Sequence, residues 1–417
     1  MKIAVLWWGN INDAPNSALN QRLSYLADRH EVALYVTPTA RVSGPLTRKV
    51  EVRRVPEAPC LLRGEVASTT VQVCLSAAEF IRTVVWTLRA LASEPGLRQG
   101  VVYSFHTPEA AVARLAQCFG YRWVADILDM PDLYLEVVES QRALGRRAIL
   151  RPLKYRYVYR LPRIFAHADL VLTTAHGPGR GFAQRLVQEF GVRPERLHTV
   201  SNGVDLSLVH PTGRKPPIDV FRATYVGMVA PSRGVDVLLE ATRVASQRIE
   251  RLELCLVGDT YKPYEATVTR AVEKLERAAG RPVISLHGFL PHDRLRALVE
   301  DSHVCLYPFP KTPILDGVRP IKVFEYLALG RPVVATDLDG VREIVQHEVN
   351  GLVVPPSNSL ALADALVRLY QRPDDLGRFA AAARPSVLRY DWRLINERVE
   401  HTVREFAQDG GPMGTGR

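Results

Sequence analysis

The segment that could best support chemistry is 319–336, where a lysine and a glutamate are three residues apart. Pro320 suits the first position of a helix, and Gly330 suits its end. Lys322 and Glu325 would then project from one face of the first turns. Free N–H groups at a helix start, with a lysine beside them, attract a phosphate, and a carboxylate one turn further on can accept hydrogen bonds from ribose hydroxyls. The alternative interpretation is a surface ion pair with i, i+3 spacing.

Glycine also follows three predicted strands in the second half of the chain. Gly227 lets the backbone approach a ligand closely, and Arg233 in the same loop can bind a diphosphate through two parallel hydrogen bonds. One such turn is weak evidence, and Asp259 and His287 are explained equally well as ordinary turn residues. The candidate residues near these strand ends are Gly227, Arg233, Gly234, Gly258, Asp259, Gly288 and Phe289.

The elements that must position these residues alternate between apolar, strand-like runs and helix-length segments. This alternation predicts an α/β fold with two Rossmann-like, doubly wound domains, which bind ligands at the carboxyl ends of their parallel strands. The predicted helices include 17–27, 108–118, 235–244, 294–301, 321–329 and 360–372. The predicted strands are 3–8, 31–37, 50–55, 101–105, 123–128, 170–173, 197–200, 223–226, 252–257, 283–286, 303–307, 332–336 and 352–354.

The length of 417 residues suits two domains of roughly 200 residues each. Near the middle the composition becomes polar and proline-containing, and proline continues neither helix nor strand. We therefore expect an N-terminal domain at 1–206, a linker at 207–220 and a C-terminal domain at 221–385. A C-terminal helix at 386–407 and a disordered, glycine-rich tail at 408–417 should follow.

The composition, 47% hydrophobic and 24% charged, is typical of a soluble globular protein. No apolar run reaches the ~20 residues that cross a bilayer, because Arg82 and Arg89 interrupt the best candidate. The five cysteines are scattered without a Cys-x-x-Cys pair, and the histidines lack the spacing of a helical metal site. These patterns predict reduced thiols, a cytoplasmic location and no metal site.

The net charge of +10 favours anionic partners. Residues 142–163 carry eight basic side chains, no acidic one and three tyrosines. Three interpretations remain open: peripheral contact with the anionic inner membrane face, contact with a phosphorylated, lipid-linked acceptor, and a solvated helix face. Nucleic acid is not expected as a partner, because no nucleic-acid-binding module is present.

The order and spacing of these segments resemble those of family-4 retaining glycosyltransferases, which have the GT-B architecture. The matching segments are 201–205, 227–234, 257–259, 287–289 and 325–335. The resemblance implies a retaining enzyme without metal or other cofactor. It would bind a UDP- or GDP-type sugar on its C-terminal domain and a glycan, lipid-linked or small-molecule acceptor on its N-terminal domain. By position, Glu325 would hold the ribose, Arg233 and Lys322 would stabilise the departing diphosphate, and Val323 would line the donor site.

Three features depart from the family pattern. Arg233 stands where a lysine is common, and guanidinium supplies the same charge. Gly317 occupies the place of a second glutamate that contacts the donor sugar; Asp316 beside it is a candidate substitute or a solvated loop carboxylate. The N-terminal half lacks the usual Gly-Gly loop and cleft histidine. The candidate acceptor-side residues are Gly9, Asn10, His106 and Asp129, and the last two are also candidate catalytic residues.

Other classes of protein can share this architecture. A nucleotide-sugar epimerase or a sugar phosphorylase would be a second enzyme class, and a non-catalytic nucleotide-sugar-binding partner protein would be a third. A Rossmann dehydrogenase is disfavoured, because the first strand is not followed by Gly-x-Gly-x-x-Gly.

Overall fold

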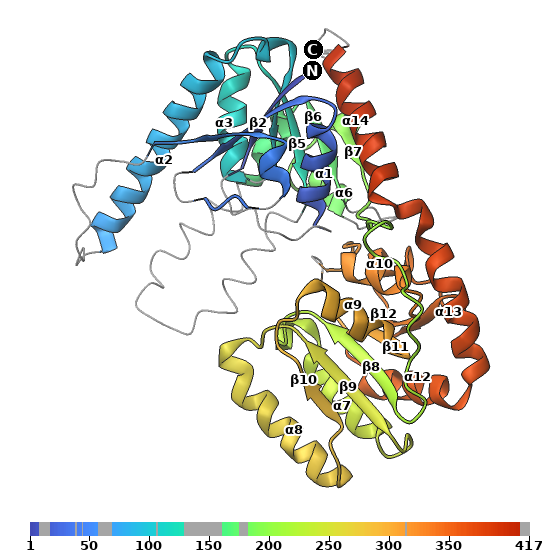
Figure 1. The fold of residues 1–417 in the computed structure, drawn as a ribbon. Coiled ribbons are helices and arrows are strands. Elements are labelled where there is room, and N and C mark those ends of the chain that lie inside the picture. Colours follow the sequence, from blue (N-terminus) through green and yellow to red (C-terminus); the bar gives the residue numbers. More distant parts are fainter. Residues whose placement is uncertain are drawn as a thin grey trace. The chain divides into compact units, whose positions relative to one another are not determined.

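The computed structural model describes residues 1–7, 17–37, 40–43, 45–56, 69–105, 107–128, 161–174, 182–312 and 315–408. They form two compact units, each with its own parallel sheet (Figure 1). Unit 1 comprises Met1–Thr174, Phe182–Val200 and the C-terminal segment from Asn396, and unit 2 is built on Ser201–Ile395.

The sheet of unit 1 has the strand order β3-β2-β1-β4-β5-β6-β7. Its central strands are buried on both faces, which explains their continuous apolar sequences. The order reverses between β1 and β4, so that unit 1 has a topological switch point there. The strands are β1 (Lys2–Leu6), β2 (Glu31–Val36), β3 (Glu51–Arg54), β4 (Val101–Ser104), β5 (Arg122–Ile127), β6 (Leu170–Thr173) and β7 (Leu197–Thr199).

Helices cover both faces of this sheet. The Ser17 side chain accepts a hydrogen bond from the Asn20 N–H and so caps the first helix. At the other end of the chain, Val399 and Val403 of the last helix join the core of unit 1. The helices are α1 (Ala18–Ala27), α2 (Thr69–Ala92), α3 (Thr107–Gln117), α6 (Phe182–Gln188) and α14 (Trp392–Gln408).

The sheet of unit 2 has the order β10-β9-β8-β11-β12-β13, with its switch point between β8 and β11. The strands are β8 (Phe221–Val226), β9 (Leu252–Val257), β10 (Ile284–Leu286), β11 (Val304–Tyr307), β12 (Val333–Thr336) and β13 (Gly351–Val354). The helices are α7 (Val235–Ala245), α8 (Glu265–Ala279), α9 (His292–Glu300), α10 (Ile321–Ala328), α11 (Asp339–Arg342), α12 (Ser359–Gln371) and α13 (Pro373–Val387).

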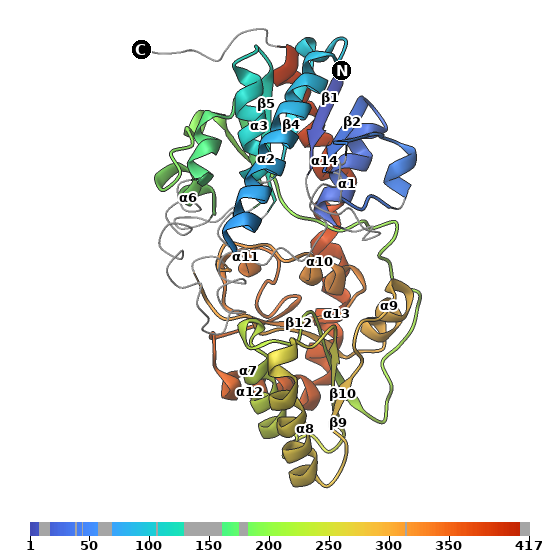
Figure 2. The same ribbon diagram turned by 90° about the vertical axis from the view of Figure 1, so that its left-hand side faces the viewer.

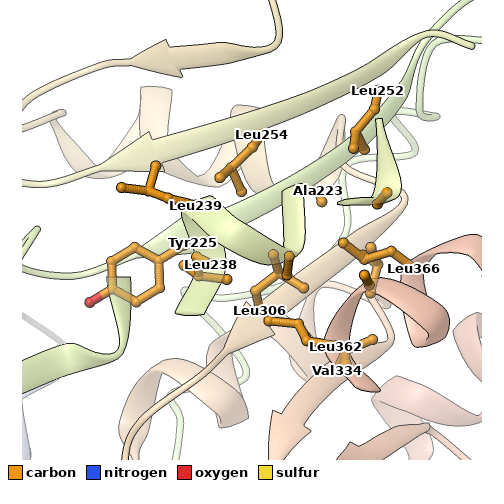
Figure 3. Close-up of a cluster of buried hydrophobic side chains, with 14 of the residues drawn as sticks. Ala223, Tyr225, Leu238, Leu239, Leu252, Leu254, Leu306, Val334, Leu362 and Leu366 are labelled. Carbon is orange, nitrogen blue, oxygen red and sulfur yellow. The ribbon is translucent and has the colours of Figure 1, made fainter. Parts of the chain in front are cut away.

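Two apolar clusters hold unit 2 together, one on each face of its sheet. In the first, Leu238 of α7 and Leu366 of α12 meet Tyr225, Leu254 and Leu306 of the strands (Figure 3). The second cluster joins the opposite strand faces to α9, α10, α11 and α13. Because both faces are covered, all residues of β11 and most residues of β8, β9 and β12 are hydrophobic.

The predicted fold class is confirmed: every predicted strand is present, with ends that differ by at most two residues. The six predicted helices correspond to α1, α3, α7, α9, α10 and α12. Residues 207–220, predicted as a linker, contain neither helix nor strand and group with unit 2. The segment predicted as one C-terminal helix contains the end of α13, a short turn and α14. Across the described residues, no helix combines the length and apolar character that a membrane span requires.

Candidate functional site

Three neighbouring strands of unit 2 end in glycines that the structure brings together. The N–H of Gly227 donates to the Val257 carbonyl at 2.8 Å, and the N–H of Gly258 donates to the Gly288 carbonyl at 2.8 Å. At Gly258 the backbone has φ +131°, and a Cβ atom would lie 2.2 Å from the carbonyl oxygen of Gly227. Glycine is therefore required at position 258, directly after β9.

The loops after β8 and β11 pack against each other at the switch point of this sheet. Gly234 has φ +75°, and a Cβ atom there would lie 2.1 Å from the carbonyl oxygen of Pro308. Next to it, the guanidinium carbon of Arg233 lies 5.1 Å from the ring centroid of Phe309. This cation–π contact and the fixed backbone hold the Arg233 charge, half-buried, at the carboxyl edge of unit 2.

The helix α10 begins at this same edge, and of its first N–H groups that of Val323 donates to the Pro320 carbonyl at 3.1 Å. Pro320 occupies the N-cap, and no side chain of the described residues caps the helix there. Lys322 Nζ lies 3.4 Å from Glu325 Oε2, with 39% and 14% of the two side chains exposed. The i, i+3 ion pair considered as the alternative is thus present. It lies at an uncapped helix start, where an anion is also favoured.

A buried tyrosine ties α10 to the end of β8. The N–H of Val226 donates to the hydroxyl oxygen of Tyr326 at 2.9 Å, and this side chain is fully buried. Burial raises the pKa of Tyr326 far above its usual value, so that the hydroxyl stays neutral. Because Val226 directly precedes Gly227, the bond fixes the helix bearing Lys322 and Glu325 beside the glycine loop.

The start of α10 is held by a second set of contacts that sequence reasoning did not find. The Asn202 side-chain amide donates to the Arg319 carbonyl at 2.9 Å. Arg319 itself is buried and forms an ion pair with Glu343, at the end of α11. These contacts give the 201–205 segment a physical role, because its asparagine positions the residue that precedes Pro320. The arginine directly before the helix was the one signal available in the sequence.

Asp316, a candidate for the donor sugar, has defined partners. Its Oδ1 atom accepts a hydrogen bond from the Asp339 N–H at 3.0 Å and lies 3.2 Å from Lys311 Nζ. The carbonyl of Asp316 accepts from the Gly340 N–H at 2.7 Å. Since the side chain is only 17% exposed, it is not the solvated loop carboxylate considered as an alternative. It anchors the beginning of α11.

The remaining donor-side candidates differ in exposure. Asp259 is exposed, and its carbonyl accepts from the Val229 N–H at 3.0 Å, which joins the loops after β8 and β9. Phe289 is 76% exposed, whereas Val323 lies on the buried face of α10. The structure therefore brings the predicted donor residues to one edge of unit 2, but only some of their side chains are accessible to a ligand.

The acceptor-side candidates Gly9, Asn10, His106 and Asp129 lie outside the described residues, as does most of the basic stretch 142–163. The strands before these candidates, β1, β4 and β5, are neighbours in the sheet of unit 1. Where the structure is described, no three His, Cys, Asp or Glu side chains gather closely enough to hold a metal ion.

The sequence of unit 2 matches a known family. Residues 221–372 match the family described as Glycosyl transferases group 1. The chain is 26% identical over 247 residues to the amylovoran biosynthesis glycosyltransferase AmsK of Erwinia amylovora, covering 58% of this chain and 57% of that protein. It is 26% identical over 369 residues to the D-inositol 3-phosphate glycosyltransferase of Saccharomonospora viridis, covering 85% and 80%. The match thus spans little more than half of AmsK, but most of the second relative.

Solved structures share the fold over nearly the whole chain. Anabaena HepE in complex with UDP superposes with a TM-score of 0.65 at 19% identity, covering 97% of this chain and 100% of that one. Sucrose-phosphate synthase from Thermosynechococcus elongatus superposes with a TM-score of 0.68 at 18% identity, covering 97% and 98%. The fold is therefore the GT-B fold of two Rossmann-like domains, and the comparisons together support a glycosyltransferase.

Proposed function

We propose that the protein is a retaining, metal-independent glycosyltransferase that binds a UDP- or GDP-type sugar at the carboxyl edge of unit 2. One observation carries the proposal: Arg233 and the lysine-bearing start of α10 flank the switch point between β8 and β11. The Gly234–Pro308 contact and the Tyr326–Val226 hydrogen bond place them there. Open α/β sheets bind ligands at such a point, and a diphosphate is the ligand that this charge suits.

In the proposed reaction, the bond between the anomeric carbon and the diphosphate oxygen breaks, and its electron pair leaves with the diphosphate. Arg233, Lys322 and the α10 N–H groups stabilise the negative charge that grows there. Glu325 accepts hydrogen bonds from the ribose hydroxyls. The acceptor hydroxyl attacks the oxocarbenium-like carbon from the leaving-group face, which retains configuration, and its proton passes to the departing phosphate oxygen.

The acceptor is proposed as a glycan, a lipid-linked sugar or a small polyol. The names of relatives support this range: one is named for amylovoran biosynthesis, and others are named for D-inositol 3-phosphate and phosphatidyl-myo-inositol. A UDP-sugar is the first donor to test, because the Anabaena protein was solved with UDP and with UDP-glucose.

The test measures release of nucleoside diphosphate from UDP- and GDP-sugars, with EDTA present. Acceptors would be phosphorylated polyols, oligosaccharides and polyprenyl-diphosphate sugars. We expect acceptor-dependent release from at least one pair, strongly reduced in Arg233→Ala and Lys322→Ala. Arg251→Ala is the matched control, because it removes an exposed arginine that precedes β9 at the opposite edge of the sheet.

The other classes of protein would give different results. Conversion of the donor sugar without acceptor would indicate an epimerase, and nucleotide binding without turnover would indicate a non-catalytic partner. NMR of the glycosidic product reports the anomeric configuration, and inversion would contradict the retaining mechanism. Full activity in both Arg233→Ala and Lys322→Ala would contradict the proposed donor site.

A further inference from the structure

The first turns of α10 carry two opposite charges that are paired with each other. Figure 2 shows α10 and α11 at one end of unit 2, and on α10 the Lys322 Nζ atom lies 3.4 Å from Glu325 Oε2. An ammonium group and a carboxylate at this distance cancel most of each other's field at longer range. The pair therefore adds almost no net charge to the start of the helix.

The two members of this pair differ in exposure. The Lys322 side chain is 39% exposed, whereas that of Glu325 is only 14% exposed. A largely covered carboxylate loses more free energy than an exposed one when a neighbouring cation moves away. A ligand that draws the lysine towards itself must therefore offer new hydrogen bonds to the glutamate, or it leaves a covered negative charge without its cation.

Arg233, the other cation of the proposed donor site, is held in a different way. Among the described residues, no carboxylate lies within ion-pair distance of it, and its guanidinium carbon lies 5.1 Å from the ring centroid of Phe309. The Phe309 ring stacks in turn on Tyr307, with the centroids 4.1 Å apart and the ring planes 12° apart. A cation–π contact leaves the arginine its full charge, whereas an ion pair cancels the charge of the lysine.

We propose that the Lys322–Glu325 pair makes this site selective for nucleoside diphosphates over inorganic pyrophosphate. The inference rests on the proposed function, which assigns the diphosphate to Arg233 and Lys322 and the ribose to Glu325. Pyrophosphate attracts the lysine but gives the glutamate nothing in exchange, and the carboxylate then faces an anion. A nucleoside diphosphate offers phosphate oxygens to the lysine and hydroxyls to the glutamate at the same time, so that both charges keep a partner.

The two cations then have separate tasks. Arg233 binds the phosphate groups of any diphosphate, because its charge is not cancelled by an ion pair. Lys322 adds to the affinity when a ribose engages Glu325 and so releases the lysine. Inorganic anions would otherwise compete with the donor for the start of α10, where helix N–H groups favour them.

The test is isothermal titration of the full chain with inorganic pyrophosphate, UDP and GDP. Removing both charges in Lys322→Met/Glu325→Gln should keep the pyrophosphate affinity within about twofold of the wild type, because the pair adds almost no net charge. The same variant should bind UDP or GDP at least about tenfold more weakly, since the contact of the lysine with the phosphate is lost. Arg233→Met should bind both kinds of ligand at least about tenfold more weakly.

Glu325→Gln alone tests the competition within the pair. It keeps a hydrogen-bond acceptor but releases the lysine, so that it should bind pyrophosphate about threefold more tightly, as expected for the loss of one partly exposed ion pair. The matched control is Arg243→Met/Glu240→Gln, which removes another i, i+3 ion pair, on α7. This control should change the affinity for neither kind of ligand, and thermal unfolding of each variant checks that the fold is kept.

Three results would overturn the proposed selectivity. They are absence of pyrophosphate binding to the wild type, an unchanged pyrophosphate affinity in Glu325→Gln, and a loss of pyrophosphate affinity in Lys322→Met/Glu325→Gln as large as its loss of UDP or GDP affinity. Failure of both UDP and GDP to bind the wild type would instead contradict the proposed function itself.

Discussion

Glu325 is the residue whose assigned role can be separated most cleanly from a structural one. Its side chain is 14% exposed and lies 3.4 Å from Lys322 Nζ at the start of α10. If it accepts hydrogen bonds from the ribose, Glu325→Ala should weaken nucleoside diphosphate binding by about 10- to 100-fold, as expected for bonds to a charged group. Isothermal titration with UDP and GDP measures this loss.

The ligand supplies the control for this prediction. A 2′,3′-dideoxynucleoside diphosphate lacks the hydroxyls that Glu325 would bind, so the wild type and Glu325→Ala should bind it with similar affinity. Glu240→Ala, which removes a glutamate from an exposed ion pair with Arg243, should change neither affinity. An equal loss of affinity for both ligands in Glu325→Ala would show that the residue acts on the fold rather than on the ribose.

A histidine in unit 2 makes stability depend on pH. Burial, aided by the nearby charges of Arg331 and Arg222, lowers the pKa of His303 from 6.5 to about 4. Its Nδ1 atom accepts a hydrogen bond from the Arg222 N–H at 3.1 Å, and protonation would break that bond. The folded state disfavours the charged form of His303. The stabilisation that the neutral imidazole gives is therefore complete above pH ~6.5 and is lost as pH falls towards ~4.

We expect His303→Asn, which keeps an acceptor atom but does not titrate, to show a shallower loss of unfolding free energy between these pH values. Between pH ~6.5 and ~4 the wild type should lose about 3 kcal/mol more unfolding free energy than His303→Asn. Urea unfolding at several pH values measures it. Parallel pH profiles for the wild type and His303→Asn would contradict the assigned cause.

At the residue scale, the sequence revealed side chains whose role depends on local spacing. Lys322 and Glu325 were predictable because they share one helix, and Gly227 because it follows a strand. The ion pair between Arg319 and Glu343 was not predictable, because it joins the start of α10 to the end of α11, which only the folded sheet brings together. Asp316 was recognised as a candidate, but its bond to the Asp339 N–H depends equally on tertiary structure.

At the scale of elements, the orientation of α10 depends on contacts at both ends of its first turns. Tyr326 fixes it to β8, and the Asn202–Arg319–Glu343 contacts fix the residue before it. Replacing Arg319 with methionine leaves a partly buried carboxylate unpaired and should destabilise the fold by about 3 kcal/mol. The start of α10 should then be less well placed for an anion.

The affinities for two ligands, measured below the unfolding temperature, separate an effect on the position of the α10 start from an effect on the stability of the fold. Arg319→Met should bind nucleoside diphosphate about fivefold more weakly, because a helix start contributes roughly 1 kcal/mol to anion binding. It should bind the unphosphorylated nucleoside like the wild type. Arg243→Met is the control, an exposed arginine in an i, i+3 pair on α7. Unchanged diphosphate affinity in folded Arg319→Met would contradict the positioning role.

Elements were predictable where burial gives them a simple pattern. Strands such as β1 and β11 are covered on both faces, so an uninterrupted apolar run identifies them. The helix α2 was not named as a helix, because apolar residues such as Ile81 and Val85 occupy its outer face and blur the expected periodicity. A segment of this kind can be interpreted only when a structure shows which side is covered.

At the scale of the molecule, a buried polar cluster joins the layers of unit 1. Arg22 of α1 lies 2.7 Å from Asp126 of β5, and both side chains are fully buried. Arg22 Nε donates to Asn396 Oδ1 of α14 at 2.8 Å, and the Tyr103 hydroxyl of β4 donates to Asp126 at 2.6 Å. Burial raises the pKa of Asp126 despite the nearby guanidinium, so the pair must overcome a desolvation cost.

Removing one member of this cluster should destabilise unit 1 strongly. Arg22→Met leaves the Asp126 carboxylate buried without its cation, and we expect a loss of about 3–5 kcal/mol. The double change Arg22→Met/Asp126→Leu removes both charges and should recover much of that loss. Denaturant unfolding measures Arg22→Met, Asp126→Leu and the double variant. A double variant that is as unstable as the sum of the two single variants would contradict the ion-pair explanation.

The division of the chain could be predicted only in part. Two α/β halves follow from the strand pattern, but the return of α14 to the core of unit 1 does not, because Val399 and Val403 look like any amphipathic helix face. The acceptor-side hypotheses for His106 and Asp129 stay predictions, since both residues lie outside the described part of the chain.

The central claim is that Arg233 and Lys322 hold a diphosphate at the carboxyl edge of unit 2. The most direct measurement uses thermal shift and titration to determine the binding of UDP- and GDP-sugars. The proteins compared are the wild type, Arg233→Ala, Lys322→Ala and Arg251→Ala. At about 100 times its dissociation constant, a true donor should stabilise the wild type and Arg251→Ala by about 2.7 kcal/mol. It should stabilise the other two variants far less. Equal donor affinity in all four proteins would contradict the claim.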